Sequence, residues 1–154
     1  MISSNQYVVF SLNEQLFALR LAAVERIIRA VEVTPLPGAP AIVLGVINLR
    51  GRILPVFNVR GRFRLPEREI ELSDQIIVAR ARTRGVALVV DEVRGVREGL
   101  GEEAVAAEEI LPGLEHVAGV AKLGGEIILL HDLDKFLSLA EERALDGVLE
   151  LSYS

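Results

Sequence analysis

The fold is decided by one stretch of the chain, GVINLRGRILPVFNV at residues 45–59. The same pattern returns without a gap, 74 positions later, as GVAKLGGEIILLHDL at residues 119–133. Five positions are identical, and most others place apolar against apolar; the identical pairs are Gly45/Gly119, Val46/Val120, Leu49/Leu123, Gly51/Gly125 and Ile53/Ile127. The repeat predicts two copies of one small β module, and a seam between two modules is a common place for binding.

The repeat continues toward the N-terminus at a shorter spacing of 69 residues. The aligned segments are 7–10 with 76–79, 17–19 with 86–88, Val24 with Val93 and Ile27 with Val96. Two copies do not make a solenoid, which needs about three or more repeats. Chance similarity between two apolar β stretches is the alternative, but it does not account for the coincidence of the glycines.

Each copy is expected to form hairpins, because β-branched and aromatic residues fill residues 7–12, 16–21, 75–81 and 86–90. Arg50-Gly51 and Gly124-Gly125 each separate two apolar runs by two residues, and glycine there suits a primed hairpin turn. The strands expected at 52–58 and 126–132 are apolar on both faces, so both faces should be covered. Pro55 cannot donate to a sheet ladder, which predicts an edge strand at that point.

Helix is scarce in this pattern. The best candidate runs from Asp132 to Asp146, with Asp132 or Asp134 as its cap and Gly147 as its end. A shorter helix is expected after Asn58, at residues 59–63.

Composition favours one domain, or two small units tightly joined, in these 154 residues. Each half, at roughly 70 residues, is near the lower limit for an independent core, so the halves should pack on each other. No cysteine is present, which excludes disulfides and thiol chemistry. Residues 1–6 lack the features of a signal peptide. The longest apolar stretch, residues 41–47, falls far short of the roughly 18 residues of a membrane span, so no membrane insertion is expected.

Charge is divided unevenly along the chain, with a net +3 over residues 1–73 and a net −8 over residues 74–154. A dipolar molecule can orient itself against a charged partner, although ordinary solvated surface charge gives the same count. The basic run at residues 60–64 is followed at once by Glu67, Glu69 and Glu71. Because nucleic-acid binding needs basic stripes interleaved with exposed aromatics, no nucleic-acid partner is expected.

Catalytic and metal-binding patterns are weak. His116 and His131 are the two histidines, and His131-Asp132 occupies the places of Phe57-Asn58 in the other copy, which indicates a strand end followed by a cap. A zinc site would need more histidine or cysteine ligands. The serines lack a nucleophile elbow, and the glycines form no phosphate-binding or dinucleotide motif. We expect no enzyme, no metal and no cofactor, while an acid–base pair assembled from distant acids, such as Asp91, stays open.

The apolar cluster at residues 41–44 follows a connector rich in proline and is either core or an interaction patch. Here the sequence resembles a known family. The block at residues 45–56 resembles the signature stretch of CheW-like domains, the coupling proteins of bacterial chemotaxis arrays. Weaker blocks in the same order also resemble it, at 10–12, 17–19, 33–37, 89–93 and 132–137. The resemblance covers roughly residues 6–139.

The resemblance implies a mostly β fold of two SH3-like five-stranded β-barrels packed around a shared hydrophobic interior, with short helices and a C-terminal helix. Residues 1–154 would form a single CheW-like domain. Subdomain 1 would take residues 14–72 with part of the terminal segments, and subdomain 2 residues 73–140.

The resemblance also implies function: a non-enzymatic adaptor that joins the regulatory domain of the histidine kinase CheA to chemoreceptor cytoplasmic tips. Its place would be cytoplasmic, at the inner face of the membrane in receptor arrays. Kinase contacts would map to Ile42, Val43, Leu44 and Gly45. Receptor contacts, in the groove between the barrels, would map to Leu12, Val24, Glu25, Ile27, Ile28, Arg50, Val93 and Val96, with Arg50 matching the family arginine tied to assembly.

One departure from the family lies in that receptor set. Family members often have Val-x-Glu-Ile where this chain has Val24-Glu25-Arg26-Ile27, so the acid stands one place early. This suggests a different receptor class or a non-flagellar system such as twitching or gliding motility. A small barrel that binds nucleic acid is a more distant alternative and predicts binding that falls steeply with salt. The sequence names neither the receptor nor the kinase.

Overall fold

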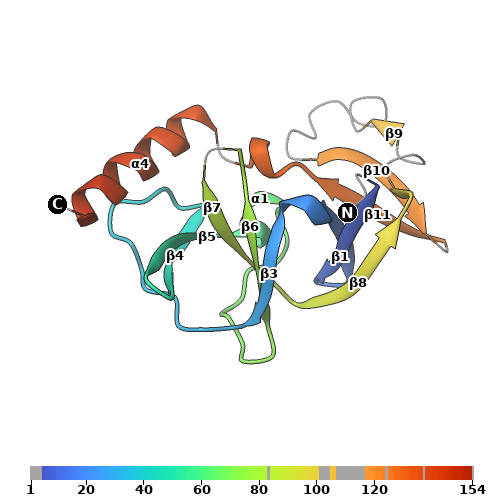
Figure 1. Cartoon of the computed structure of the whole chain (residues 1–154), viewed down its shortest axis with the longest axis horizontal. Coiled ribbons are helices and arrows are strands. Elements are labelled where there is room, and N and C mark those ends of the chain that lie inside the picture. The colour runs from blue at the N-terminus through green and yellow to red at the C-terminus, as the bar shows by residue number, and fades with distance from the viewer. Residues whose placement is uncertain are drawn as a thin grey trace.

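The computed structural model describes residues 5–82, 84–100, 105–106, 117–123, 125–136 and 138–153 (Figure 1). The strands are β1 (Gln6–Leu12), β2 (Gln15–Arg20), β3 (Val24–Arg29), β4 (Val43–Leu49), β5 (Arg52–Phe57), β6 (Gln75–Arg80), β7 (Gly85–Val90), β8 (Glu92–Glu98), β9 (Val105–Ala106), β10 (Val117–Leu123) and β11 (Glu126–His131). The helices are the 3-10 turns η1 (Leu21–Ala23) and η2 (Leu133–Lys135) and the α-helices α1 (Val59–Arg62) and α4 (Leu139–Tyr153). Within the described residues, no helix is both long and apolar enough to span a membrane.

The strands form two sheets that lie side by side along the long axis of the molecule (Figure 1). Sheet A has the order β8-β1-β2-β11-β10-β9, and sheet B has the order β3-β6-β7-β5-β4. The two-residue strand β9 adds to the edge of sheet A beyond the five strands expected for each barrel. The expected class, mostly β with two strand units, short helices and a C-terminal helix, is confirmed.

The sequence repeat becomes an exchange of hairpins between the sheets. Strands β1, β2, β3, β4 and β5 of the first copy correspond in order to β6, β7, β8, β10 and β11 of the second. Sheet A joins the β1–β2 hairpin to strands of the second copy through a parallel β2–β11 pair, and sheet B joins the β6–β7 hairpin to strands of the first copy through a parallel β5–β7 pair. Each sheet therefore contains strands from both sides of residue 73, where the boundary between the two subdomains was expected.

Even the irregularities repeat. One residue is left out of the strand register at Glu25 in β3 and at Arg94 in β8, which are 69 positions apart. The same happens at Leu44 in β4 and at Ala118 in β10, which are 74 positions apart. Because a bulge bends a strand and redirects a side chain, both copies bend their sheets at the same places.

The turn expected at Arg50-Gly51 is confirmed. Arg50 has φ 51° and Gly51 has φ 89°, the pair of positive values that a primed two-residue turn requires. The Gly51 N–H donates to the Asn48 side-chain oxygen at 2.8 Å. In the second copy Gly125 also has positive φ, whereas Gly124 lies outside the described residues.

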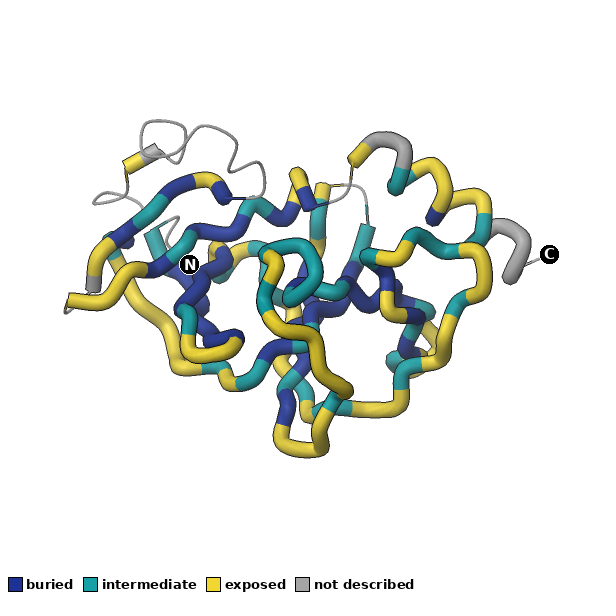
Figure 2. Tube along the Cα trace, turned by 180° about the vertical axis from the view of Figure 1, so that it is seen from behind, coloured by how far each residue is buried: buried dark blue, intermediate teal, exposed yellow. Residues whose placement is uncertain are grey.

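A shared core joins the two sheets. The largest buried cluster contains Phe10 and Phe17 from sheet A together with Phe57 and Leu88 from sheet B. Two smaller clusters fill the separate interior of each sheet unit. Figure 2 shows the buried segments along the strands of both halves and through the middle of the molecule. This arrangement confirms the expected shared hydrophobic interior.

All five phenylalanines belong to one chain of ring contacts that runs from sheet A to sheet B. The successive centroid distances are 5.7 Å for Phe10–Phe17, 4.8 Å for Phe17–Phe63, 5.3 Å for Phe63–His131, 5.5 Å for His131–Phe136 and 4.4 Å for Phe136–Phe57. Aromatic pairs at such distances contribute beyond the area they bury, so this chain helps to hold the two halves together.

Pro55 does not mark an edge strand, so that prediction was wrong. Its strand, β5, lies between β7 and β4. The ladder from β5 to β7 includes only Val56 and Phe57 and thus begins just after the proline. The missing N–H of Pro55 is therefore not required by either neighbouring strand.

The predicted helix from Asp132 to Asp146 is interrupted. Asp132 caps the short η2 turn, as expected of a cap, by accepting from the Asp134 N–H at 3.2 Å. The long helix α4 then starts after Ser138 and continues through Gly147 to Tyr153. Ser138 and Glu141 form a reciprocal capping box, with N–H to side-chain oxygen distances of 2.9 and 3.1 Å. The short helix expected after Asn58 is confirmed as α1, capped by the Asn58 side chain.

Candidate functional site

Five of the seven large apolar side chains that are exposed in the described residues mark two faces, whereas Val105 and Ile127 lie elsewhere on sheet A. Val31, Leu44 and Leu72 line one open groove of about 940 Å³, here called the Leu44 groove. Ile27 and Val96 lie on the edge strands β3 and β8, and the exposed residues of these two strands are here called the edge-strand face. Contiguous exposed apolar surface of this kind is typical of protein-binding sites.

The Leu44 groove takes its shape from a bulge. Val43 pairs with Phe57 and Gly45 pairs with Val56, so Leu44 is left between two paired positions. Its side chain is 38% exposed, whereas that of Val43 is only 7% exposed. The segment after β3, at residues 30–33 with Pro35, and the loop at 67–72 form the other walls.

Gly45 permits the close approach of one of these walls. A Cβ at this position would lie 2.2 Å from the backbone oxygen of Thr34. Thr34 and Val46 exchange two backbone hydrogen bonds of 2.9 and 2.8 Å, so the segment after β3 crosses directly over Gly45. No side chain larger than hydrogen fits there without displacing the backbone.

The four predicted kinase-contact residues therefore have different roles. Only Leu44 presents a well-exposed side chain, and Ile42 is partly buried against the shared core. Val43 and Gly45 are buried, so neither presents a side chain at this surface. The alternation of strand residues buries Val43, and the crossing segment covers Gly45.

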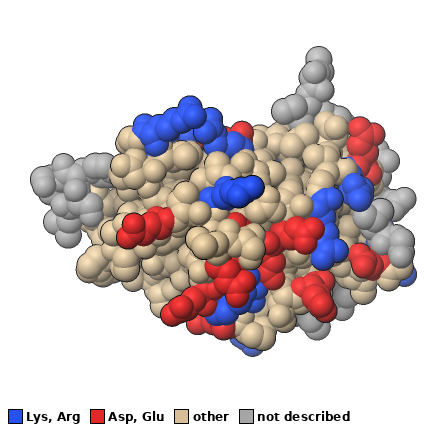
Figure 3. Space-filling model, turned by 90° about the horizontal axis from the view of Figure 1, so that it is seen from below, with Lys and Arg blue, Asp and Glu red and all other residues tan. Residues whose placement is uncertain are grey.

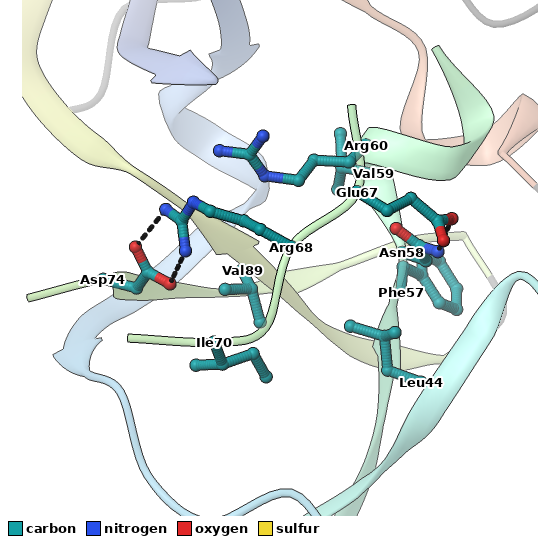
Figure 4. Close-up of a pocket in the computed structure, with 10 residues that line it drawn as sticks. All are labelled: Leu44, Phe57, Asn58, Val59, Arg60, Glu67, Arg68, Ile70, Asp74 and Val89. Carbon is teal, nitrogen blue, oxygen red and sulfur yellow. Dashed lines mark hydrogen bonds and ion pairs between the residues drawn. The ribbon is translucent and has the colours of Figure 1, made fainter. Parts of the chain in front are cut away.

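An ion pair holds the loop wall of the groove. The Arg68 guanidinium donates to both carboxylate oxygens of Asp74, at 2.9 and 2.6 Å, and also to Asp91 at 2.8 Å. Figure 4 shows Arg68 turned toward Asp74, beside a small pocket of about 70 Å³ that Leu44 and Ile70 also line. The Arg68 side chain, in the loop at residues 67–72, is thus directed inward, toward Asp74.

The same contacts shift the pKa values of this pair. Burial raises the pKa of Asp74, but hydrogen bonds from Arg68 and from the Glu71 N–H outweigh it, and the pKa lies below its ordinary value. The hydrogen bond to Asp74 raises the pKa of Arg68 above its ordinary value. Both groups are therefore charged at neutral pH, and each stabilises the other.

The edge-strand face is defined by strand register. Ile27 is paired with Ile77, which belongs to the shared core, so Ile27 projects from the side of sheet B that meets sheet A. Val96 is paired with Val8, which shares a strand face with the core residue Phe10. Both exposed side chains therefore project from the inter-sheet sides of their strands.

Other predicted receptor contacts surround these two side chains. Val24 and Val93 are partly buried against the same shared core, which brings the two edge strands together beside it. Arg50 is exposed at the β4–β5 turn. That turn lies close to β3, because Arg52 and Glu25 form an ion pair of 2.8 Å.

Three residues of the predicted receptor set are less accessible to a partner protein. Leu12 is 0% exposed, because its strand position directs it into the shared core. Ile28 is partly buried against the interior cluster of sheet B. Glu25 lies at the β3 bulge, and the hydrogen bond from Arg52 lowers its pKa, so its carboxylate is already engaged within the chain.

The two faces differ in charge, which sequence reasoning missed. The edge-strand face exposes both arginines and glutamates, namely Arg26, Arg29, Arg94 and Arg97 with Glu25, Glu92 and Glu98, whereas the border of the Leu44 groove carries Glu32, Glu67, Glu69 and Glu71. Figure 3 shows a group of acidic side chains gathered on the lower face of the molecule. In the sequence, the acids at alternate positions 67, 69 and 71 were the signal of this acidic border, but only the fold places them beside an apolar groove.

The residues considered for chemistry occupy structural positions. His131 is buried between Phe63 and Phe136, and Asp91 accepts from Arg68 and from the Asn13 N–H. His116 lies outside the described residues. In the part of the chain that the structure describes, no three His, Cys, Asp or Glu side chains are grouped so as to hold a metal ion.

Comparison with known proteins gives a consistent set of similarities. A family model described as CheW-like domain matches residues 6–144. "Chemotaxis protein CheW" of Treponema pallidum is 28% identical over 91% of this chain and 86% of its own length, and that of Rhizobium meliloti is 33% identical over 90% and 91%. The crystal structure of the scaffolding protein TtCheW from Thermoanaerobacter tengcongensis is similar with a TM-score of 0.81 and 27% identity, covering 90% of this chain and 96% of that one.

Proposed function

This chain belongs to the CheW-like domain family, and from that premise we propose that it is a non-enzymatic adaptor that couples chemoreceptors to a CheA-type histidine kinase. The family model spans most of the chain, and the similar proteins are named as chemotaxis or scaffolding proteins. The observation that carries the proposal is the presence of two exposed apolar faces on one body with a shared core.

The kinase's regulatory domain is assigned to the Leu44 groove. The supporting observation is that the residues expected to contact the kinase lead to this bulge, and that Leu44 projects there among other exposed apolar side chains. Val43 and Gly45 contribute by packing and by close backbone approach. A central apolar side chain within a larger contact surface is the usual form of an interface hot spot.

The receptor's cytoplasmic tip is assigned to the edge-strand face. Ile27 and Val96 would contact the apolar side of a receptor helix, as amphipathic helices bind in apolar grooves. Because Glu25 is engaged by Arg52, the polar part of recognition falls to the exposed arginines, including Arg26. This function places the protein in the cytoplasm, at receptor arrays on the inner face of the membrane.

A three-component binding experiment tests the adaptor role. The purified chain, the regulatory domain of the cognate kinase and a soluble receptor-tip fragment are mixed and separated by size-exclusion chromatography with light scattering. A ternary complex is expected, because the two faces are separate. Competition between kinase domain and receptor fragment for one site on the chain would refute the assignment of two faces.

A non-flagellar receptor–kinase system is the second candidate, favoured by the exposed Arg26 at a position where the family often has glutamate. Deletion of the gene that encodes this chain distinguishes the two possible outputs, flagellar swimming and surface motility. Loss of directed swimming supports the flagellar system, whereas loss of surface motility with normal swimming supports the other.

A further inference from the structure

We propose that the Leu44 groove selects a protein partner whose apolar contact element is bordered by lysine or arginine side chains. The inference rests on the proposed function, in which the occupant is the kinase's regulatory domain. It adds the chemistry of that occupant, which follows from the charge around the groove.

The apolar side chains that line the groove are open to solvent. Leu72 is 93% exposed, and Val31 and Leu44 are also exposed beside it. Val33 and Ile70 are partly buried and continue the apolar surface between them. A partner that covers this surface gains apolar burial, but apolar burial alone would select poorly among partners.

The border of the groove is acidic because of how the 67–72 loop is held. Arg68 points inward to Asp74 and Asp91, so its charge is neutralised within the chain. Its neighbours Glu67 and Glu69 are exposed, as is Glu71. Glu67 accepts from the Asn58 side chain at 2.9 Å and keeps its negative charge at the border.

Three of the border acids, Glu32, Glu67 and Glu69, form no ion pair among the described residues. Glu32 and Glu69 stand on different walls of the groove. A partner with basic side chains at its own border would place them opposite these acids. Complementary charge of this kind raises the rate of association and repels partners of the wrong sign.

Charge also argues against one form of self-association. Two copies meeting groove to groove would bring Glu32 and Glu69 of each against the same acids of the other, which is unfavourable. A head-to-tail contact would set these acids against the mixed arginines and glutamates of the edge-strand face, and it would occupy the surface assigned to the receptor. The occupant of the Leu44 groove is therefore a different protein and not a second copy of this chain.

The experiment measures association and dissociation rate constants for the cognate kinase regulatory domain at 50 and 500 mM salt. The variants are Glu32→Lys/Glu69→Lys, Leu44→Ala and, as a control, Glu126→Gln on the exposed surface of β11. We expect the charge reversal to lower the association rate about 10-fold at low salt and far less at high salt, because salt screens exposed charges. Leu44→Ala should mainly raise the dissociation rate, and the control should match the wild type.

Three outcomes overturn the inference. Equal association rates for the wild type and the charge-reversal variant would show that the acids do not select the partner. Head-to-tail self-association, detected by sedimentation and abolished by Arg94→Glu, would give the groove to a second copy. A wild-type chain that does not bind the kinase domain under any salt condition would overturn the proposed function first, and this inference with it.

Discussion

Arg68 and Asp74 form a two-pronged ion pair, with N–O distances of 2.9 and 2.6 Å, although Asp74 is only 2% exposed. Asp74 also accepts the Glu71 N–H at 2.8 Å, and its backbone oxygen accepts the Ala30 N–H at 3.0 Å. Asp74 thus joins both walls of the Leu44 groove: its carboxylate holds the 67–72 loop, and its backbone oxygen holds the segment after β3. Through Asp91, Arg68 further connects this groove to the junction between β7 and β8.

The first prediction concerns the contribution of the Asp74 carboxylate to the free energy of unfolding. Asp74→Asn should lower the free energy of unfolding by about 1.5–3 kcal/mol, because hydrogen bonds between charged groups are lost from a buried position. Chemical denaturation at pH 7 measures this difference. Glu69→Gln, an exposed change on the same loop, should be neutral within about 0.5 kcal/mol. Equal stabilities for wild type and Asp74→Asn would show that the ion pair does not support the wall.

The second prediction concerns pH. The folded-state pKa values of Asp74 and Glu141 lie below their ordinary values, so each carboxylate binds its proton less readily in the folded state than in the unfolded state. Their stabilisation is fully present above the ordinary carboxyl pKa of about 4 and is lost as pH falls through the folded pKa.

The pH prediction is checked by comparing variants. The difference in unfolding free energy between wild type and Asp74→Asn should stay constant from about pH 5 to 7 and shrink below about pH 4. Urea titrations across this range measure it. A difference that grows on acidification would have the wrong sign and would reject the assigned cause.

The third prediction separates Leu44 from its neighbour. Leu44→Glu should leave the fold intact and weaken binding of the kinase regulatory domain by about 10-fold or more, because an exposed apolar contact is lost. Val43→Glu should instead destabilise the protein by about 3–5 kcal/mol, since it buries an unpaired charge. Thermal unfolding and binding isotherms for both variants test the distinction, which fails if Val43→Glu folds normally.

The fourth prediction addresses the edge-strand face. Ile27→Glu and Val96→Glu should each weaken binding of a receptor-tip fragment by about 10-fold or more and leave kinase binding unchanged. Leu44→Glu is the reciprocal control and should retain receptor binding. Sedimentation with receptor-containing membranes measures both effects. Normal receptor binding by both edge-strand variants would place the receptor elsewhere.

The fifth prediction concerns two glycines. Gly45→Ala should destabilise the fold by about 1–3 kcal/mol or more, because its methyl group would overlap the Thr34 carbonyl. Gly147→Ala should stabilise α4 by about 0.5–1 kcal/mol, because alanine favours helix and, beyond the helix's own backbone, no described neighbour lies within 4 Å of the added Cβ. Melting temperatures of the two variants should therefore move in opposite directions.

Much of the fold could be predicted because its signals are local. The two-residue turn at Arg50-Gly51 and the α1 cap at Asn58 depend on residues that are close in sequence. The break before α4 was missed, although Ser138 and Glu141 have the spacing of a capping box, because the apolar spacing across residues 133–140 resembles one continuous helix.

The candidate site was only partly predictable for a different reason. The apolar cluster at residues 41–44 is visible in the sequence pattern, whereas Ile27 and Val96 were proposed from the resemblance to CheW-like domains. The sequence could not distinguish Leu44 from the buried Val43, because that distinction depends on a bulge in the register with β5. Leu12 was proposed from the resemblance, and its burial in the shared core depends on the second sheet, which the sequence pattern does not show.

The sequence by itself determined that the chain is a duplicated β module with two turn glycines in equivalent places, because hydrophobic period and turn chemistry are written in neighbouring residues. Only the tertiary structure decided that each sheet takes its hairpin from the other copy, and that four glutamates gather at the border of one apolar groove. Those outcomes depend on which strand edges meet and which side chains they cover, and such long-range contacts leave no period along the chain.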